Sequence, residues 1–285
     1  MRIRAPAKVN LRLRVVGKRK DGYHLLDTIM VPVSLYDDIV ITKDETRQPS
    51  FRTLKVTCSH PLVPQGRANL VHKAAAFFLS KSRKNLRLHI HIHKRIPVGA
   101  GLGGGSSDAA ATMVGLNRLL GLKLPSKKLE KLSLSLGADV PFFINARPAR
   151  ARGIGERLTP LGKLPRMWLV ILYPGFPVST AWVYRKLSLK LTKPSANTSI
   201  NPILGNASAL RKLLVNDLEA VTMGRYPEIG LLKSKLTEEG AIGTLMSGTG
   251  SSVFGIFNSR QRAEKAFRRL RKIDGLKAFL VRILD

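Results

Sequence analysis

Apolar and polar residues alternate along several stretches of the chain, and this period of two predicts β-strands. In the stretch over residues 86–93, one predicted face is aliphatic and the other carries His89, His91 and His93. Similar runs predict further strands, and the second of them contains a predicted bend at Asp37 and Asp38. These strands cover residues 2–16, 31–41, 51–58, 168–172, 278–284, and 243–257 as two strands around a glycine turn.

Stretches rich in helix-forming residues lie between these strands. Start or stop signals mark three of them: Asn69 and Ser126 are predicted N-caps, and Gly121 and Gly137 are predicted to follow helix ends. We expect Val140 to be extended because it precedes Pro141. The predicted helices cover residues 70–80, 109–120, 127–136, 180–187, 217–223, 230–239 and 260–273.

The order of these elements indicates the fold class. Strands and helices occur in both halves of the chain without strict β–α–β alternation, which predicts an α+β fold. A length of 285 residues suits one large domain or two closely associated ones. We place the boundary at residue 160, which gives domains of residues 1–160 and 161–285. Residues 192–206 are polar and rich in Pro, Ser and Asn, which predicts a loop.

The composition is that of a globular protein. The chain is 44% hydrophobic and contains no run of 18 apolar residues, so we expect no transmembrane helix. Its first residues carry no apolar signal segment. A single cysteine, Cys58, excludes an intramolecular disulfide and is typical of a reducing compartment. Together these features predict a cytoplasmic protein that does not associate with membranes.

The charge is the unusual feature of the composition. Lys and Arg number 49 against 18 Asp and Glu, which gives a formal net charge of +31. Such a chain attracts polyanions, so an RNA-binding protein is an alternative to any enzymatic function. However, the basic residues are spread along the whole chain and no RNA- or DNA-binding motif is present. We therefore expect a broadly basic surface and no specific nucleic-acid partner.

A glycine-rich stretch over residues 97–108 is the strongest functional signal. Five of the seven residues from Gly99 to Gly105 are glycine, and the stretch lies between a predicted strand and a predicted helix. The N-terminus of a helix binds phosphate through free N–H groups and the positive end of its dipole. We expect Gly103 and Gly104 to be glycine because phosphate contacts the backbone there. The hydroxyls of Ser106 and Ser107 are candidates to bind a phosphate oxygen or a metal ion.

This stretch matches neither of the two commonest phosphate-binding loops. A Walker loop ends in Gly-Lys-Ser/Thr, but no lysine lies between Lys94 and Lys123. A dinucleotide fingerprint needs an acidic residue about 20 positions further on, and Glu130 lies in the next predicted helix. The spacing instead resembles the phosphate-binding motif of the GHMP kinases. The form Gly-Gly-Gly-Ser-Ser-Asp-Ala-Ala is similar to that of the members that phosphorylate a CDP-linked methylerythritol.

Motifs elsewhere in the chain support this resemblance. They are residues 6–11 with 21–24, residues 94–97 before the loop, residues 137–141, residues 216–219 and residues 246–254. The resemblance implies a two-domain protein with an N-terminal half like ribosomal protein S5 domain 2. It also implies transfer of the γ-phosphate of ATP, with Mg²⁺, to the 2-hydroxyl of the small-molecule acceptor in the non-mevalonate isoprenoid precursor pathway. The expected assembly is a monomer or a homodimer.

The resemblance assigns ATP binding to the glycine-rich loop, with Asn69 and Lys94 as candidates on the adenosine side. Ser107 is the candidate Mg²⁺ ligand, and Ser106 remains the alternative. The loop residues expected to contact ATP are Pro97, Val98, Gly99, Ala100, Gly101, Leu102, Gly103, Gly104, Gly105, Ser106 and Ser107.

Two charged residues are the catalytic candidates. Asp139 is flanked by apolar residues, an environment that suits an ionised carboxylate only when a cation lies close. On the residues alone, Asp139 is also compatible with a structural helix cap. Lys8 lies in an otherwise apolar strand, where lysine is usual only when paired or when its head reaches water. The resemblance implies that Asp139 activates the acceptor hydroxyl and that Lys8 assists it.

Four residues are candidates to bind the acceptor. Asn10 shares the strand face of Lys8 and is expected to bind hydroxyls of the acceptor. Tyr23 and His24 follow a glycine turn, and the resemblance implies that they bind the cytosine base. Thr180 is expected to contribute to the same site. Gly248 and Gly250 are expected to let residues 246–254 approach and support the glycine-rich loop.

The three histidines of residues 86–93 also suggest a metal site. Neighbouring side chains on one face of a strand lie about 6.6 Å apart, so three of them hardly reach a single ion without distortion. A polar face of a sheet is therefore the favoured interpretation.

Overall fold

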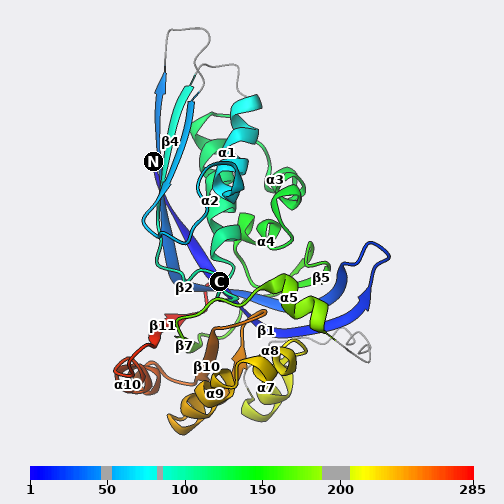
Figure 1. The fold of residues 1–285 in the computed structure, drawn as a ribbon, viewed down its shortest axis with the longest axis vertical. Coiled ribbons are helices and arrows are strands. Elements are labelled where there is room, and N and C mark those ends of the chain that lie inside the picture. Colours follow the sequence, from blue (N-terminus) through cyan, green and yellow to red (C-terminus); the bar gives the residue numbers. More distant parts are fainter. Residues whose placement is uncertain (46–52, 82–85, 188–205) are drawn as a thin grey trace. The chain divides into compact units, whose positions relative to one another are not determined.

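The computed structural model describes residues 1–45, 53–81, 86–187 and 206–285 (Figure 1). The chain forms two compact units that interleave along the sequence. The first unit contains residues 1–7, 35–98 and 103–146, and the second contains residues 8–34, 99–102 and 147–285. A domain boundary at residue 160 stays a prediction.

The first unit contains strands that hydrogen-bond around a central strand, β4 (Leu86–His93). The second half of β2 (His24–Glu45) pairs with it antiparallel, and β3 (Thr53–Cys58) pairs with it parallel. Leu86, Leu88, Ile90 and Ile92 are buried, whereas the histidines between them are exposed or half-buried. The alternation in the sequence therefore correctly predicted which face of β4 is buried.

Four α-helices complete the first unit, and all lie on one side of its strands (Figure 1). They are α1 (Leu70–Lys81), α2 (Gly104–Leu119), α3 (Ser126–Ser133) and α4 (Val140–Asn145). Short 3₁₀ turns, η1 (Gly66–Ala68) and η2 (Leu134–Leu136), precede α1 and follow α3. Helix α2 is largely buried, because Ala109, Ala110 and Ala111 bring it close to its neighbours.

The second unit is built on an antiparallel sheet with the strand order β11-β7-β10-β9. These strands are β7 (Trp168–Tyr173), β9 (Gly243–Met246), β10 (Val253–Phe257) and β11 (Lys277–Arg282). The helices of this unit are α5 (Thr180–Lys186), α7 (Ala207–Leu213), α8 (Glu219–Arg225), α9 (Glu228–Glu238) and α10 (Arg260–Leu270). Apolar residues of the strands and of α9 and α10 form one buried core, which includes Val170, Leu236 and Ala266.

The second unit also contains strand segments from the N-terminal part of the chain. Most of β1 (Arg2–Lys18) belongs to it, and β1 pairs in parallel with the short β8 (Val215–Asn216). The first half of β2 pairs antiparallel with β5 (Ala149–Gly153), which forms a hairpin with β6 (Arg157–Pro160). Helices and strands are thus mixed in both units, as the α+β prediction requires.

Three local predictions are wrong. Asp37 and Asp38 lie within the continuous strand β2, because Lys94 and two backbone N–H groups bind the Asp37 carboxylate, and the side chain of Arg2 pairs with that of Asp38. Val140 is helical because Pro141 occupies the first turn of α4, where proline needs no N–H partner. Ser126 is the first residue of α3 and makes no capping bond.

The predicted loop over residues 192–206 lies, except for Asn206, outside the described residues.

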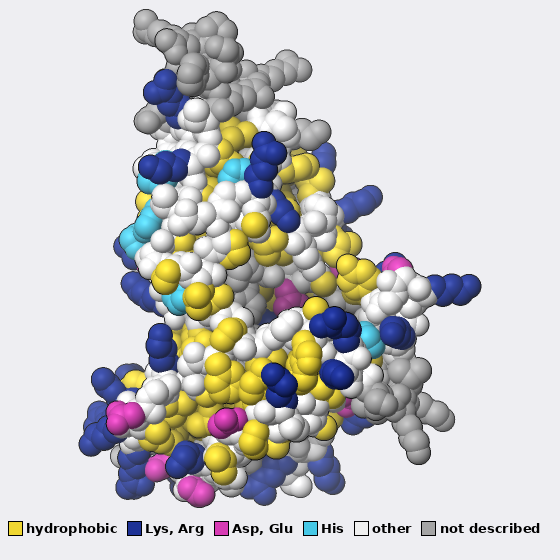
Figure 2. All heavy atoms as spheres, viewed as in Figure 1, with side chains coloured by type: hydrophobic (Ala, Val, Ile, Leu, Met, Phe, Trp, Pro, Cys, Tyr) yellow, Lys and Arg dark blue, Asp and Glu magenta, His cyan; other side chains and the backbone are white. Residues whose placement is uncertain are grey.

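Basic side chains occur at many separate places on the face drawn in Figure 2, and acidic ones are few. This distribution agrees with the expected broadly basic surface. Within the described residues, no helix combines the length and the apolar character that crossing a membrane requires.

Candidate functional site

The glycine-rich loop is shorter than the sequence predicts, because α2 begins at Gly104 rather than near Ala109. Gly103 is the N-cap residue, with φ of 71°. Gly99 and Gly101 also have positive φ, at 66° and 75°. Left-handed backbone at these positions strongly favours glycine, which explains the alternation of glycine with Ala100 and Leu102. Ala100 and Leu102 are themselves buried and anchor the loop.

The carbonyl groups of residues 99–102 accept hydrogen bonds from other parts of the second unit. The four donors, at 3.0–3.2 Å, are Val178 N–H to Gly99, Ser252 N–H to Ala100, Ser247 Oγ to Gly101, and Lys8 N–H to Leu102. Because every carbonyl in this segment accepts a hydrogen bond, these bonds fix the segment to the rest of the second unit.

The N–H groups of the same loop are left available. No acceptor among the described residues takes the N–H groups of residues 99–106, and the first intrahelical bond is from Ser107 N–H to Gly103 O, at 2.9 Å. The last three of these N–H groups form the first turn of α2, where the helix dipole is positive. A run of free donors at a helix N-terminus is typical of an anion-binding site.

The glycine-rich loop and the turn between β9 and β10 approach each other closely, and each has a glycine at the contact. A Cβ atom on Gly101 would lie 1.9 Å from Ser247 O, and one on Gly248 would lie 3.1 Å from Gly101 O. Residues 246–254 therefore approach and support the loop, as the sequence predicted. A side chain at Gly101 would push the two segments apart.

Gly104 and Gly105 differ in what surrounds them. A Cβ atom on Gly104 would lie 2.8 Å from Lys94 Nζ and 3.0 Å from Ile96 Cγ2, so this position faces the interior of the first unit. A Cβ atom on Gly105 would meet no atom within 4 Å. Close packing is thus a structural reason for glycine at position 104, and contact of its backbone with phosphate stays a prediction. Gly105 presents the open surface.

Ser107, like Ser252, has a buried hydroxyl group without a hydrogen-bond partner among the described residues. A buried hydroxyl without a partner is unfavourable in the free protein, so Ser107 Oγ is a candidate to bind a ligand. A hydroxyl oxygen is also a suitable ligand for Mg²⁺. Ser106 is less buried. The structure therefore favours Ser107 over Ser106 as the residue that fits the metal.

Lys94 lies in a buried ionic cluster rather than on an open surface. Its Nζ atom donates to Asp37 and, at 2.8 Å, to Asp108 Oδ2. Burial raises the pKa of Asp108 to about 7, because desolvation outweighs the attraction of Lys94. Burial alone would lower the pKa of Lys94, but Asp108 and Asp37 raise it. This cluster ties the end of β4 to the first turns of α2.

Replacing Lys94 with Met is expected to lower the free energy of unfolding by about 3–5 kcal/mol, because Asp37 and Asp108 lose their buried cation. Denaturant unfolding at pH 7 measures this loss. Because protonation neutralises an unpaired carboxylate, the loss is expected to shrink as the pH falls. Wild-type stability combined with weakened ATP binding would instead favour the predicted contact with adenosine.

Asn69 also serves the fold. Its Oδ1 atom accepts from Val71 N–H at 2.8 Å, which caps α1 as the sequence predicted, and its Nδ2 atom donates to Pro64 O at 2.9 Å. The side chain is nearly fully buried. A contact of Asn69 with adenosine stays a prediction.

Lys8 and Asn10 lie together on β1 in the second unit. The Lys8 Nζ atom donates to Asn10 Oδ1 at 2.6 Å, and both side chains are buried. The prediction that they share a strand face is confirmed. A Cβ atom on Gly248 would lie 3.4 Å from Lys8 Nζ, so the ammonium group lies beside the turn that supports the loop.

Asp139 occupies the N-cap position of α4 in the first unit, and its side chain makes no capping bond. This observation weighs against the structural alternative, in which Asp139 caps the helix. The residues that follow, Val140 and Phe142, are buried and fix the helix in place. Because Lys8 and Asp139 belong to different units, their pairing stays a prediction.

Of the two predicted base-binding residues, His24 lies in an aromatic pair with a residue that the sequence did not reveal. Tyr23 is 60% exposed. The His24 ring stacks on Tyr184 of α5, with ring centroids 5.1 Å apart and an interplanar angle of 29°. Burial and the charge of Lys18 lower the pKa of His24, so the imidazole is neutral at neutral pH. Thr180 begins the same helix as Tyr184.

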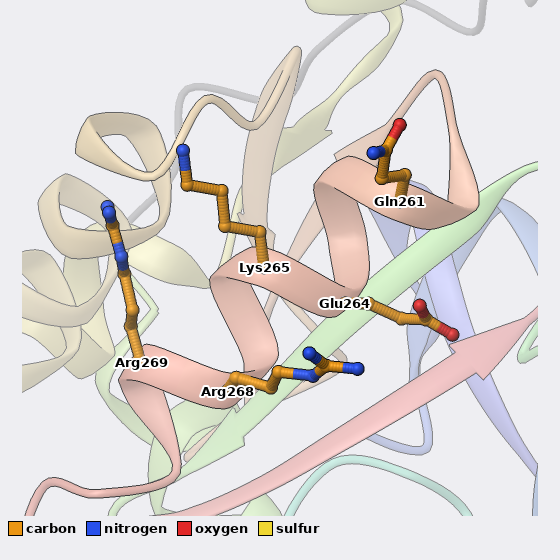
Figure 3. Close-up of a pocket in the computed structure, with 5 residues that line it drawn as sticks. All are labelled: Gln261, Glu264, Lys265, Arg268 and Arg269. Atoms are coloured by element: carbon orange, nitrogen blue, oxygen red, sulfur yellow. The ribbon is translucent and has the colours of Figure 1, made fainter.

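A separate pocket of about 490 Å³ lies along α10 (Figure 3). Its lining residues are Gln261, Glu264, Lys265, Arg268 and Arg269. Their side chains extend from one helix without converging on a point (Figure 3), and Glu264 accepts from Arg260 at 2.7 Å. None of the predicted site residues lines this pocket, so we do not assign the function to it.

Comparison with known proteins identifies the family. The profile of the GHMP kinases N terminal domain matches residues 69–147, and that of the GHMP kinases C terminal matches residues 200–274. A 4-diphosphocytidyl-2-C-methyl-D-erythritol kinase from Citrifermentans bemidjiense is 47% identical over 284 residues, covering 100% of this chain and 99% of the relative. This chain belongs to the 4-diphosphocytidyl-2-C-methyl-D-erythritol kinase family. A kinase of the same name from Geobacter sulfurreducens is 46% identical over 269 residues, which cover 94% of each chain.

Solved structures agree with membership of this kinase family. A crystal structure of 4-(cytidine 5'-diphospho)-2C-methyl-D-erythritol kinase has a TM-score of 0.83 at 37% identity, and the match covers 100% of each chain. A homoserine kinase from Cytophaga hutchinsonii has a TM-score of 0.75 at 18% identity, covering 100% of this chain and 94% of that one. The second match shows only that the fold is shared. These relatives are kinases, so they give no support to the RNA-binding alternative.

Proposed function

We propose that this protein transfers the γ-phosphoryl group of ATP to the 2-hydroxyl of 4-diphosphocytidyl-2-C-methyl-D-erythritol, a step in the non-mevalonate isoprenoid precursor pathway. The observation that carries the proposal is the glycine-rich loop, whose carbonyls are bonded and whose N–H groups at residues 99–106 are free. Full-length identity of 47% to a kinase of this name supports the choice of acceptor.

The loop binds the phosphates of ATP through its free N–H groups and the N-terminus of α2. Phosphoryl transfer requires positioning and charge neutralisation more than covalent chemistry. Mg²⁺, when bound, neutralises the negative charge of the phosphates, and Ser107 Oγ is the ligand that fits it. The remaining loop contacts, from Pro97 to Ser106, orient the triphosphate.

At the acceptor, Asp139 takes the proton of the attacking hydroxyl and Lys8 stabilises the charge that develops. Asn10 shares a strand face with Lys8 and binds a neighbouring hydroxyl. Tyr23, His24 and Tyr184 hold the cytosine base, since stacked rings offer a flat apolar surface and a neutral imidazole offers a hydrogen bond to the base edge. Thr180 lies near enough in sequence to Tyr184 to contribute to this subsite.

Consumption of ATP by the purified protein tests the proposal directly. We expect turnover that requires both Mg²⁺ and the CDP-linked acceptor, with one ADP formed for each acceptor phosphorylated. ATP consumption that does not depend on the acceptor, or none at all, would contradict the proposed function.

Replacing His24 with Ala is expected to raise the KM for the CDP-linked acceptor by roughly 10- to 100-fold, because polar groups of the base lose their partner. The KM for ATP is expected to stay near the wild-type value, because the glycine-rich loop is unchanged. Steady-state kinetics with each substrate varied in turn measures both constants. Equal changes in the two KM values would count against base recognition by His24.

A further inference from the structure

A short chain of hydrogen bonds continues beyond Lys8 and Asn10 in the second unit. Asn10 Nδ2 donates to Thr28 Oγ1 at 2.8 Å, and Thr28 Oγ1 donates to the backbone oxygen of Arg12 at 2.7 Å. Together with the bond from Lys8 Nζ to Asn10 Oδ1, these contacts link three buried side chains on β1 and β2. Thr28 is 2% exposed, so water does not compete for its hydroxyl.

The number of protons fixes the direction of this chain. A threonine hydroxyl has one proton, and Thr28 donates it to a carbonyl oxygen that can only accept. The remaining lone pairs of Oγ1 must then accept from Asn10, which turns the NH₂ end of the amide toward Thr28. The oxygen end of the amide is thereby turned toward Lys8, whose ammonium can only donate. The reversed amide would place two donors face to face at Lys8.

The neighbouring residue holds Thr28 in place. The carboxylate of Asp27 accepts from Arg150 Nε at 2.7 Å and from Arg12 Nη2 at 3.1 Å, and all three side chains are buried. These ion pairs tie β2 to β1 and to β5 at the level of the Thr28 hydroxyl. Thr28 is therefore held in one position, and its hydroxyl determines the orientation of the Asn10 amide.

We propose that Thr28 is a positioning residue for phosphoryl transfer: it sets the amide of Asn10, and through it the ammonium of Lys8, in the orientation that the acceptor requires. The inference rests on the proposed function of Lys8 and Asn10. Thr28 itself is too buried, and its hydroxyl too fully bonded, to bind substrate. Small displacements of a catalytic group lower the rate steeply, so loss of this orientation affects kcat more than KM.

The test compares isosteric and conservative variants. Thr28→Val keeps the shape but removes the hydroxyl, and we expect kcat to fall by about 10- to 100-fold with the KM for ATP unchanged. Thr28→Ser keeps the hydroxyl and is expected to retain kcat within about threefold. Thr42→Val is the matched control: it removes a hydroxyl from an exposed part of the same strand, where Thr42 Oγ1 donates to His89 O at 3.2 Å. Wild-type turnover by Thr28→Val would overturn the proposal.

A second comparison separates positioning from a merely structural role. If Thr28 acts through Lys8, adding Thr28→Val to Lys8→Ala lowers kcat no further, whereas independent effects would multiply and overturn the proposal. Should Thr28→Val fail to fold, Thr28→Ala takes its place in both comparisons.

The hydrogen bond from Asn10 to Thr28 can also be measured without turnover, so this test does not depend on the proposed function. In NMR spectra, the side-chain amide protons of Asn10 are expected to exchange slowly with water in the wild type and in Thr28→Ser, and quickly in Thr28→Val. Fast exchange in the wild type would overturn the proposal. Absence of any acceptor-dependent ATP consumption by the wild type contradicts the proposed function, and the exchange measurement still decides whether Thr28 orients Asn10.

Discussion

Replacing Asp139 with Asn is expected to lower kcat by about 10²–10⁴, because the amide keeps the shape of the side chain but cannot accept the proton of the acceptor hydroxyl. An alcohol is a weak nucleophile, so loss of the base affects the chemical step rather than binding. Asp139 makes no capping bond to α4, so capping of this helix does not account for an acidic residue at this position. We expect the acceptor to bind Asp139→Asn with nearly wild-type affinity.

Single-turnover kinetics measures the chemical step, and calorimetry with the acceptor measures binding. Retention of most of the wild-type kcat by Asp139→Asn would show that the base lies elsewhere or that the reaction needs none. Lys8→Ala provides the second arm, because the proposal has both residues acting on one hydroxyl. The double variant is then expected to be little worse than the worse single variant. If the two losses multiply, Lys8 acts independently of Asp139.

The sequence predicted the elements of the fold well, because their signals are local. The alternation over β4 follows directly from a sheet with one buried face, and Asn69 caps α1 as its position before an apolar helix indicates. The failures involve partners distant in sequence. Asp37 remains in a strand because Lys94, 57 positions later, binds its carboxylate. No local pattern reveals that pairing, and strand preference depends strongly on such context.

Part of the geometry of the candidate site was also predictable from local signals, whereas the roles of its residues stay predictions. The glycine spacing indicated a phosphate-binding loop, and the face shared by Lys8 and Asn10 followed from the period of a strand. Tyr184 was missed, because its contact with His24 joins residues 160 positions apart and no spacing rule connects them. The only available signal was its place in the short helix that begins at Thr180, which had itself been assigned to the acceptor.

The two adjacent glycines at the start of α2 give opposite predictions, which a glycine pattern alone cannot distinguish. Gly105→Val is expected to leave the protein folded and to weaken ATP binding by at least about 100-fold, a loss of about 2.7 kcal/mol. Its side chain enters the open space beside the free N–H groups of the first helical turn, where the phosphates are proposed to bind. Neither a positive φ nor a neighbouring atom within 4 Å opposes the substitution.

Gly104→Ala is the variant for comparison, because it adds only one methyl group, at the preceding position of the same helical turn. Its Cβ atom meets Lys94 Nζ and Ile96 at 2.8 and 3.0 Å, so the buried ionic cluster must move. Overpacking of this kind typically costs about 1–3 kcal/mol of stability. Thermal unfolding should therefore separate the variants before ATP is added, with Gly104→Ala less stable and Gly105→Val close to the wild type. Calorimetry with ATP then decides the role of Gly105: wild-type affinity in a folded Gly105→Val protein would place the phosphates away from this turn of α2.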